Sequence, residues 1–148
     1  MYIFKEITKE DCEIFGSWLK HEDINKWIGI DDWDKYFDFV NSEPDYFLIK
    51  ALLDNKIIGE IALEIIDEIG YIAMMINPDE QSKGHGRKIL VLFLQQINQI
   101  IDRNIKYIES GIFSDNIASK KCFESAGFKF AKNGDDGEML YIYDIENN

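Results

Sequence analysis

Hydrophobic and polar positions along the chain follow two repeating patterns. Short stretches rich in isoleucine, leucine and aromatic residues, bounded by polar turns, predict seven β-strands. The predicted strands are Tyr2–Ile7, Tyr46–Leu53, Ile57–Ile66, Ile69–Ile76, Ile105–Phe113, Phe128–Lys132 and Met139–Ile145.

Apolar residues spaced by three and four predict helices between these strands. One helix follows Thr8, a second begins at Asp31 or Asp32, a long third follows a loop at residues 81–87, and a short fourth runs from Asn116 to Gly127. The expected inner faces are Ile14, Phe15, Trp18 and Leu19 in the first, Trp33, Tyr36, Phe37 and Val40 in the second, and Ile89, Leu90, Phe93, Leu94, Ile97, Ile100 and Ile101 in the third. The order β-αα-βββ-α-β-α-ββ predicts an α/β (α+β) fold with a mixed, mostly antiparallel central sheet flanked by helices.

Local signals mark several connections between these elements. Thr8 with Asp11 three residues later is a variant of the helix capping box. The dipeptide Asp67-Glu68 between two strands predicts a hairpin, and Gly127 is expected to adopt a left-handed conformation after the short helix.

Composition narrows the class of protein. A chain of 148 residues with 46% hydrophobic residues predicts one folded domain, residues 1–148, and excludes disorder. A net charge of −12 argues against a nucleic-acid or anionic-membrane partner, and the longest apolar stretch, Ile89–Leu94, is too short to span a bilayer. Two cysteines, Cys12 and Cys122, are too few for a disulfide scaffold, and no Cys/His spacing resembles a metal site. We therefore expect a soluble cytoplasmic protein without a metal, either a monomer or a homodimer.

The charge is distributed unevenly along the chain. Residues 1–80 carry 7 basic and 19 acidic residues, residues 81–132 carry 9 basic and 4 acidic, and residues 133–148 carry 5 acidic and no basic residues. This asymmetry indicates either two ligands of opposite charge or an acidic surface that only maintains solubility.

The basic region opens with a loop suited to an anion. The loop is Gln81-Ser82-Lys83-Gly84-His85-Gly86-Arg87, and it precedes the long helix. The first amides of a helix have no internal acceptors, and glycine lets a ligand approach the backbone closely. The loop matches neither a Walker A motif nor the dinucleotide-binding fingerprint, and a tight turn without a ligand is the alternative. Within it, we expect His85 to be a surface loop residue rather than a catalyst.

Two motifs together resemble the GNAT family of acyl-CoA-dependent N-acetyltransferases. Gln81, Gly84 and Gly86 match that family's Q/R-x-x-G-x-G/A loop. A second segment matches its N-x-x-A/S-x-x-x-Y/F-E-x-x-G-F helix through Asn116, Ser119, Phe123, Glu124, Gly127 and Phe128. The predicted strand order is similar to the family's fold over almost the whole chain.

The resemblance implies a site for acetyl-CoA as co-substrate. The strands Ile69–Ile76 and Ile105–Phe113 would separate, with the pantetheine between them on the backbone of Met74, Met75 and Ile76. The amide of Met74 or Met75 would hold the oxyanion. The pyrophosphate would bind the 81–87 loop, namely Gln81, Ser82, Lys83, Gly84, His85, Gly86 and Arg87, with Asn116 near the pantetheine and Phe123 near the sulfur.

The sequence departs from better-equipped members of that family. Phe123 stands where many carry a tyrosine that protonates the leaving thiolate, and the strand Ile69–Ile76 contains no carboxylate. The remaining candidates for proton transfer are Glu60, Glu64, Glu109 and Tyr71. We therefore expect direct attack by the amine with proton transfer through water.

The acidic first half is the expected acceptor side. Trp27, Asp31, Asp32, Trp33 and, on a later strand, Glu64 combine aromatic faces with carboxylates, which suits a small cationic amine such as a polyamine or an aminoglycoside-like molecule. An amphipathic helix pair with a solvated acidic face is the alternative for these residues. For the whole chain, acetylation of a protein N-terminus or lysine, and a non-catalytic acyl-CoA sensor, remain alternatives.

Overall fold

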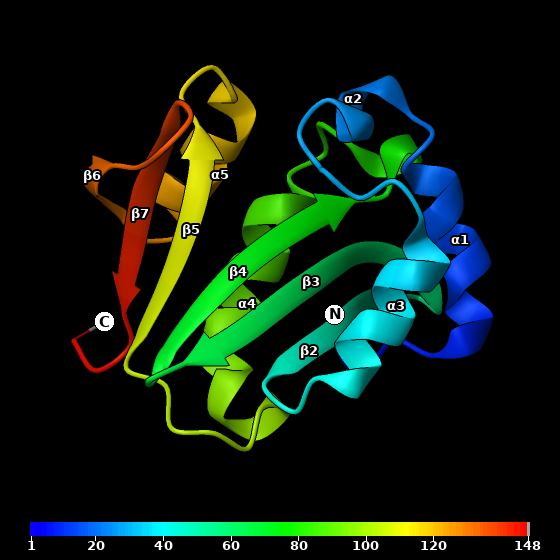
Figure 1. Cartoon of the computed structure of the whole chain (residues 1–148), viewed down its shortest axis with the longest axis horizontal. Coiled ribbons are helices and arrows are strands. Elements are labelled where there is room, and N and C mark those ends of the chain that lie inside the picture. Colours follow the sequence, from blue (N-terminus) through cyan, green and yellow to red (C-terminus); the bar gives the residue numbers. More distant parts are fainter. Residues whose placement is uncertain (148) are drawn as a thin grey trace.

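A seven-stranded sheet runs through the computed structural model, which describes residues 1–147 (Figure 1). The strands are β1 (Ile3–Glu6), β2 (Tyr46–Leu53), β3 (Lys56–Ile66), β4 (Ile69–Ile76), β5 (Tyr107–Phe113), β6 (Lys129–Asn133) and β7 (Glu138–Asp144), in the spatial order β1-β2-β3-β4-β5-β7-β6. The helices are α1 (Cys12–Trp18), α2 (Glu22–Asn25), α3 (Trp33–Ser42), α4 (His85–Ile100) and α5 (Ile117–Ser125), with 3-10 turns η1 (Lys9–Asp11) and η2 (Pro78–Glu80). The predicted fold class is confirmed.

Helices cover both faces of the sheet, and each covered face has its own core (Figure 1). On the face under α4 and α5, Phe93 packs with Ile61 and Leu63 of β3. On the face under α1 and α3, Phe15 packs with a group that includes Ala62 of β3. Alternate residues of a strand point to opposite faces, so the strands divide their side chains between these two faces. We call them the α4 face and the α3 face.

The sheet opens between its two central strands. β4 and β5 form its parallel pair, and their register covers only Ile69–Tyr71 against Tyr107–Glu109. Beyond that point β4 continues beside β3 to Ile76, while β5 continues beside β7 to Phe113. The separation of these two strands is visible in Figure 1, and it is the separation that the resemblance implied.

Most local signals have the expected structure. Asp11 accepts a 2.8 Å hydrogen bond from the backbone amide of Thr8, which completes the predicted capping box. Asp67 and Glu68 both have positive φ, as a tight hairpin turn requires, and Gly127 has a φ of 105°. The prediction of a buried Ile14 is wrong, since this side chain is 42% exposed while Phe15 and Trp18 are buried. Successive residues of an α-helix are rotated by about 100°, so Ile14 lies at the edge of the buried face that Cys12, Phe15 and Leu19 define.

The segment between the first two predicted helices contains one more helix than expected. α2 is a single turn at Glu22–Asn25, whose Ile24 is buried in the α3-face core. Among the described residues, no helix has the length and apolar character needed to cross a membrane.

Candidate functional site

The loop at residues 81–87, which we call the anion loop, has the backbone geometry that its sequence predicts. Gly84 is the N-cap of α4 with a φ of 82°, and no side chain caps this helix end. The first helical hydrogen bond runs from the Lys88 amide to the Gly84 carbonyl, so the amides of residues 85–87 have no intrahelical acceptor. A Cβ at Gly84 would meet nothing within 4 Å, which leaves open space at this helix end. Lys83, Arg87 and Lys88 are exposed around it.

Gly86 brings the start of α4 close to β4 and α5. A Cβ at this position would lie 3.4 Å from the Cys122 sulfur and 3.6 Å from Ile76. Burial raises the pKa of the Cys122 thiol to about 11, and the nearby Arg87 opposes this rise only in part. A cysteine nucleophile must be ionised, so Cys122 is a protonated packing group rather than a nucleophile.

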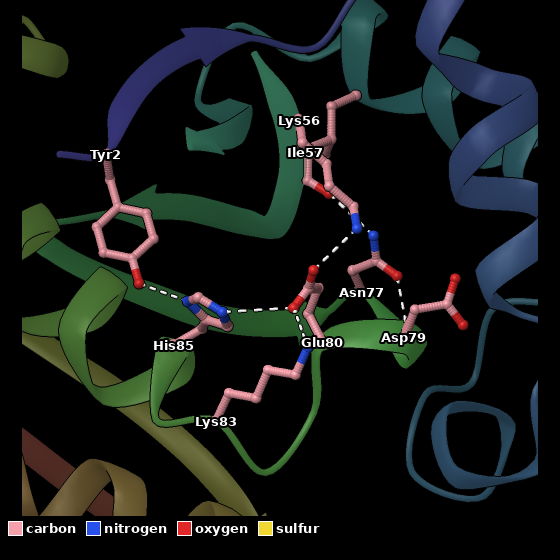
Figure 2. Close-up of polar contacts among 8 residues, drawn as sticks. All are labelled: Tyr2, Lys56, Ile57, Asn77, Asp79, Glu80, Lys83 and His85. Atoms are coloured by element: carbon pink, nitrogen blue, oxygen red, sulfur yellow. Dashed lines mark hydrogen bonds and ion pairs between the residues drawn. The ribbon is translucent and has the colours of Figure 1, made fainter. Parts of the chain in front are cut away.

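A polar cluster borders the anion loop and centres on Glu80 (Figure 2). The Glu80 carboxylate accepts hydrogen bonds from Lys56 at 2.8 Å and from Lys83 at 2.9 Å. It also lies 3.6 Å from Nε2 of His85, whose Nδ1 lies 2.6 Å from the Tyr2 hydroxyl. The hydrogen bonds from the two lysines lower the pKa of Glu80 to about 2. The His85 side chain is 13% exposed, so the expectation of a surface loop residue is wrong.

Backbone groups of β4 point into the gap between β4 and β5. Hydrogen-bonded pairs alternate along an antiparallel ladder, and Asn77 donates to Ile58 across β3 and β4. By this alternation Met75 is paired with β3, whereas the N–H and C=O groups of Met74 and Ile76 point away from β3. The Ser110 hydroxyl of β5 donates to the carbonyl of Ile72, which points to the same side.

Small residues line the α3 face of this gap. Ala73 of β4 and Gly111 of β5 both lie beyond the point where the strands part, and both are exposed. A Cβ added to Gly111 would collide with the Glu138 carboxylate, so Glu138 lies directly over this strand. Glu138 was missed at the sequence level because it precedes the predicted start of the last strand. The register that pairs it with Phe113 is the signal that identifies it.

A row of polar and aromatic residues crosses the α3 face of four adjacent strands. Tyr46 pairs with Glu64, Glu64 with Tyr71, and Tyr71 with Glu109. Glu64 and Glu109 are half-buried, and Tyr71 is 37% exposed. The fold thus brings together three residues, Glu64, Tyr71 and Glu109, that the sequence predicted from separate strands.

Trp27 lies across the end of the gap. Its ring centroid is 6.1 Å from that of Phe113, the last residue of β5. The segment after α2 therefore reaches the carboxyl end of β5, where Trp27 borders the gap on the α3 face.

Glu60 is a buried carboxyl group on the same face. It lies directly opposite Met75 and is 3% exposed. Burial raises the pKa of Glu60 to about 8, although a hydrogen bond from the Met75 amide opposes the rise. Burial and the neighbouring Glu60 carboxyl also raise the pKa of Tyr36, whose hydroxyl donates to Tyr46 at 3.4 Å.

Other predicted site residues have structural contacts. Trp33 is 3% exposed, with its ring 5.0 Å from Phe15, and is therefore out of reach of an acceptor. Asp32 caps α3 by accepting from the Lys35 amide, while Asp31 is exposed beside it.

The predicted cofactor contacts on the second motif also carry structural roles. Asn116 caps α5 through its side-chain oxygen, which accepts from the Ser119 amide at 3.2 Å. Phe123 is 4% exposed and packs edge-on against Phe128 at 4.9 Å. Over residues 1–147, no three His, Cys, Asp or Glu side chains gather in a way that could hold a metal ion.

Comparison with known proteins identifies the class. The chain matches the acetyltransferase (GNAT) family over residues 5–128. It is 25% identical over 126 residues to the uncharacterized N-acetyltransferase YfmK of Bacillus subtilis (strain 168), covering 84% of this chain and 83% of that protein. The chain therefore belongs to the GNAT family, and the expected class of enzyme, an acetyl-CoA-dependent N-acetyltransferase, is confirmed.

Solved structures share this fold. The aminoglycoside acetyltransferase AAC(6')-Ib with coenzyme A and kanamycin superposes with a TM-score of 0.84 at 17% identity, covering 97% of this chain and 95% of that one. Spermidine N-acetyltransferase from Vibrio cholerae with CoA and spermine gives 0.77 at 14% identity, covering 95% and 92%.

Proposed function

We propose that this enzyme transfers the acetyl group of acetyl-CoA to the primary amine of a small cationic acceptor, such as a polyamine or an aminoglycoside-like molecule. One observation carries the proposal. The gap between β4 and β5 has a cationic, amide-lined loop at one side and carboxylates with aromatic rings on the α3 face. A polyanion fits the loop and a cation fits the carboxylates, so the thioester would lie between them.

The cofactor side follows from the free backbone groups. The pyrophosphate would accept hydrogen bonds from the amides at the start of α4, with Arg87 and Lys88 adding positive charge. Pantetheine would pair with the β4 edge at Met74 and Ile76. Since the backbone of Met75 is paired with β3, we assign the oxyanion contact to the Met74 amide.

In the proposed reaction the neutral amine attacks the thioester carbonyl within a ternary complex. A C–N bond forms, the C–S bond breaks, the amine loses a proton, and the CoA thiolate gains one. Glu109 and Glu64 flank Tyr71 in one row, and either carboxylate could accept the amine proton through water. Because Phe123 has no hydroxyl, the thiolate proton would come from solvent.

The acceptor side is proposed to be cationic because carboxylates dominate it. Glu64, Glu109 and Glu138 come from three different strands and share the α3 face, with Trp27 and Tyr71 beside them. Two of the structurally similar enzymes were solved with the polycations kanamycin and spermine.

An amine panel tests the proposal by release of the CoA thiol. We expect spermidine and kanamycin to give higher kcat/KM than zwitterionic or acidic amines. Faster turnover of acidic amines would contradict a cationic acceptor, and preference for a lysine-containing peptide would favour protein acetylation.

Substitution of the acceptor-side carboxylates is a second test. Glu109→Gln should lower kcat/KM for polycations about tenfold. The control is Glu13→Gln, which removes an exposed carboxylate on α1 and should leave kcat/KM unchanged.

A further inference from the structure

Glu80 connects the anion loop to the rest of the molecule (Figure 2). Its Oε1 accepts from Lys56 at the start of β3, and its Oε2 accepts from Lys83 within the loop. The same Oε2 faces His85, the first residue of α4, and the Glu80 side chain is 14% exposed. One carboxylate therefore ties Lys83, in the middle of the loop, to Lys56 on a strand that is distant in sequence.

The loop benefits from such an anchor because one of its residues, Ser82, has an unfavourable backbone conformation. Ser82 has a φ of 65° and Gly84 a φ of 82°, so two of its residues have left-handed conformations. No side chain caps α4 at Gly84. Left-handed backbone is unfavourable for a residue other than glycine, and fixing each residue costs conformational entropy. External contacts must therefore select the loop conformation.

The contacts continue on both sides of Glu80. Asn77 ties the start of η2 to the start of β3 through a 3.1 Å hydrogen bond that its side-chain amide donates to the Ile57 carbonyl. On the other side, His85 lies 2.6 Å from the hydroxyl of Tyr2, at the amino end of the chain. Figure 2 shows these groups arranged around Glu80.

We propose that Glu80 is a positioning residue for acetyl-CoA: it holds Lys83 and the loop at residues 81–84 in the shape that receives the pyrophosphate. This inference rests on the proposed function, since it concerns the same cofactor site. Lys56 and Lys83 share the Glu80 carboxylate, and Lys83 belongs to the loop that would receive the anionic ligand. The low pKa of Glu80 keeps the carboxylate ionised throughout the physiological pH range.

Positioning by Glu80 and simple electrostatics predict opposite changes in CoA affinity when the charge of Glu80 is removed. Removing a negative charge beside a polyanion site should strengthen CoA binding if charge were the only effect. Loss of positioning should weaken it, because the ligand must then order the loop itself. The direction of the change therefore separates the two explanations.

Titration calorimetry with CoA on Glu80→Gln tests this directly. We expect the Kd for CoA to rise about fivefold, which is what the loss of two partly exposed ion pairs delivers. The KM for acetyl-CoA should rise by a similar factor, with kcat and the KM for the amine unchanged. Glu68→Gln is the matched control, because it breaks the exposed ion pair with Lys106 in the β3–β4 turn, and it should leave CoA binding unchanged.

Two further measurements separate positioning from a loss of stability. Amide hydrogen exchange at residues 81–87 should accelerate in Glu80→Gln while the core strands keep their protection. If Glu80 acts through Lys83, the losses in CoA affinity for Glu80→Gln and Lys83→Met should be less than additive in the double variant. Unchanged or tighter CoA binding in Glu80→Gln would overturn this inference alone. Absence of CoA binding by the wild-type chain would overturn the proposed function together with it.

Discussion

Glu60 makes the stability of this protein depend on pH in a predictable direction. Its carboxyl is 3% exposed, and burial raises its pKa to about 8 in the folded state. The unfolded chain exposes this carboxyl to water, where its pKa is about 4.5. Between these two values the folded protein holds a proton that the unfolded chain has lost.

The magnitude follows from this difference in proton binding. Stability falls with rising pH wherever the folded state binds more protons, at about 1.4 kcal/mol per pH unit for one group. The loss begins near pH 4.5 and is complete above pH 8, and it amounts to roughly 5 kcal/mol if the whole shift is realised. Such a loss is large against the roughly 5–15 kcal/mol that stabilise typical domains.

Neighbouring titratable groups do not cancel the pH dependence that Glu60 gives to the stability of the protein. The pKa of Tyr36 is raised by its own burial, so this tyrosine stays neutral. For Asp11, burial would raise the pKa but is outweighed by hydrogen bonds from Lys50 and Thr8, which leave it lowered, so that its contribution is lost only in more acidic solution. Within the window from pH 5 to pH 8, Glu60 is therefore the group whose shift sets the slope.

Urea unfolding followed by circular dichroism at pH 5, 6, 7 and 8 measures the slope. Glu60→Gln keeps the shape of the side chain but cannot ionise, so this variant should lose the slope and exceed the wild type in stability at pH 8 by about 3–5 kcal/mol. Glu64→Gln is the control, because it removes a half-buried carboxyl from the same strand face and leaves Glu60 in place. An equally steep fall with pH in Glu60→Gln would refute the reasoning.

Three other substitutions test single contacts. Gly84→Ala meets no atom within 4 Å but must adopt a φ of 82°, so unfolding measurements should show a loss of about 1 kcal/mol and calorimetry a weaker affinity for CoA. Asp32→Ala removes the cap of α3 and should cost about 1 kcal/mol in urea unfolding, while kcat/KM for the amine stays unchanged; a large fall would restore Asp32 to the acceptor site. Trp27→Ala removes the ring beside Phe113 and should raise the KM for cationic amines several-fold without changing the Kd for CoA; an equal loss of CoA affinity would contradict its place on the acceptor side.

Much of the fold follows from local sequence signals. Short apolar stretches located Tyr46–Leu53 and Ile69–Ile76 at their observed bounds, because both strands are flanked by polar turns. The start of α3 follows from Asp32, which is a helix cap in sequence and in structure. The exposure of Ile14 was not predicted because it lies at the edge of the apolar face of α1, and α2 was not predicted because a four-residue helix is too short to show a period in the sequence.

The parts of the candidate site that depend on backbone conformation could be predicted from the sequence. The parts that depend on which strands and side chains pair with one another were harder to predict. Glycines and their spacing indicated the anion loop, because backbone conformation restricts the residue type. Glu80, Glu138 and Tyr2 were missed, since each has a contact with a residue distant in sequence: Glu80 with Lys56, Glu138 with Gly111 and Tyr2 with His85. Trp33 looked like an acceptor residue because tryptophan suits both a core and a cation, and only its packing against Phe15 decides between them.

The arrangement of charge around the gap bears on how the two substrates of the proposed reaction, which are opposite in charge, would share one site. Lys83, Arg87 and Lys88 surround the start of α4 at one side of the gap, while Glu64 and Glu109 lie on the α3 face. A polyanion and a polycation approaching from separate sides would each be attracted to its own region and repelled from the other. At the separation of β4 and β5, both would reach the same backbone edge. In the proposed reaction, acetyl transfer at that edge would remove the charge of the acceptor amine, and the weaker attraction to the carboxylates would favour release of the product.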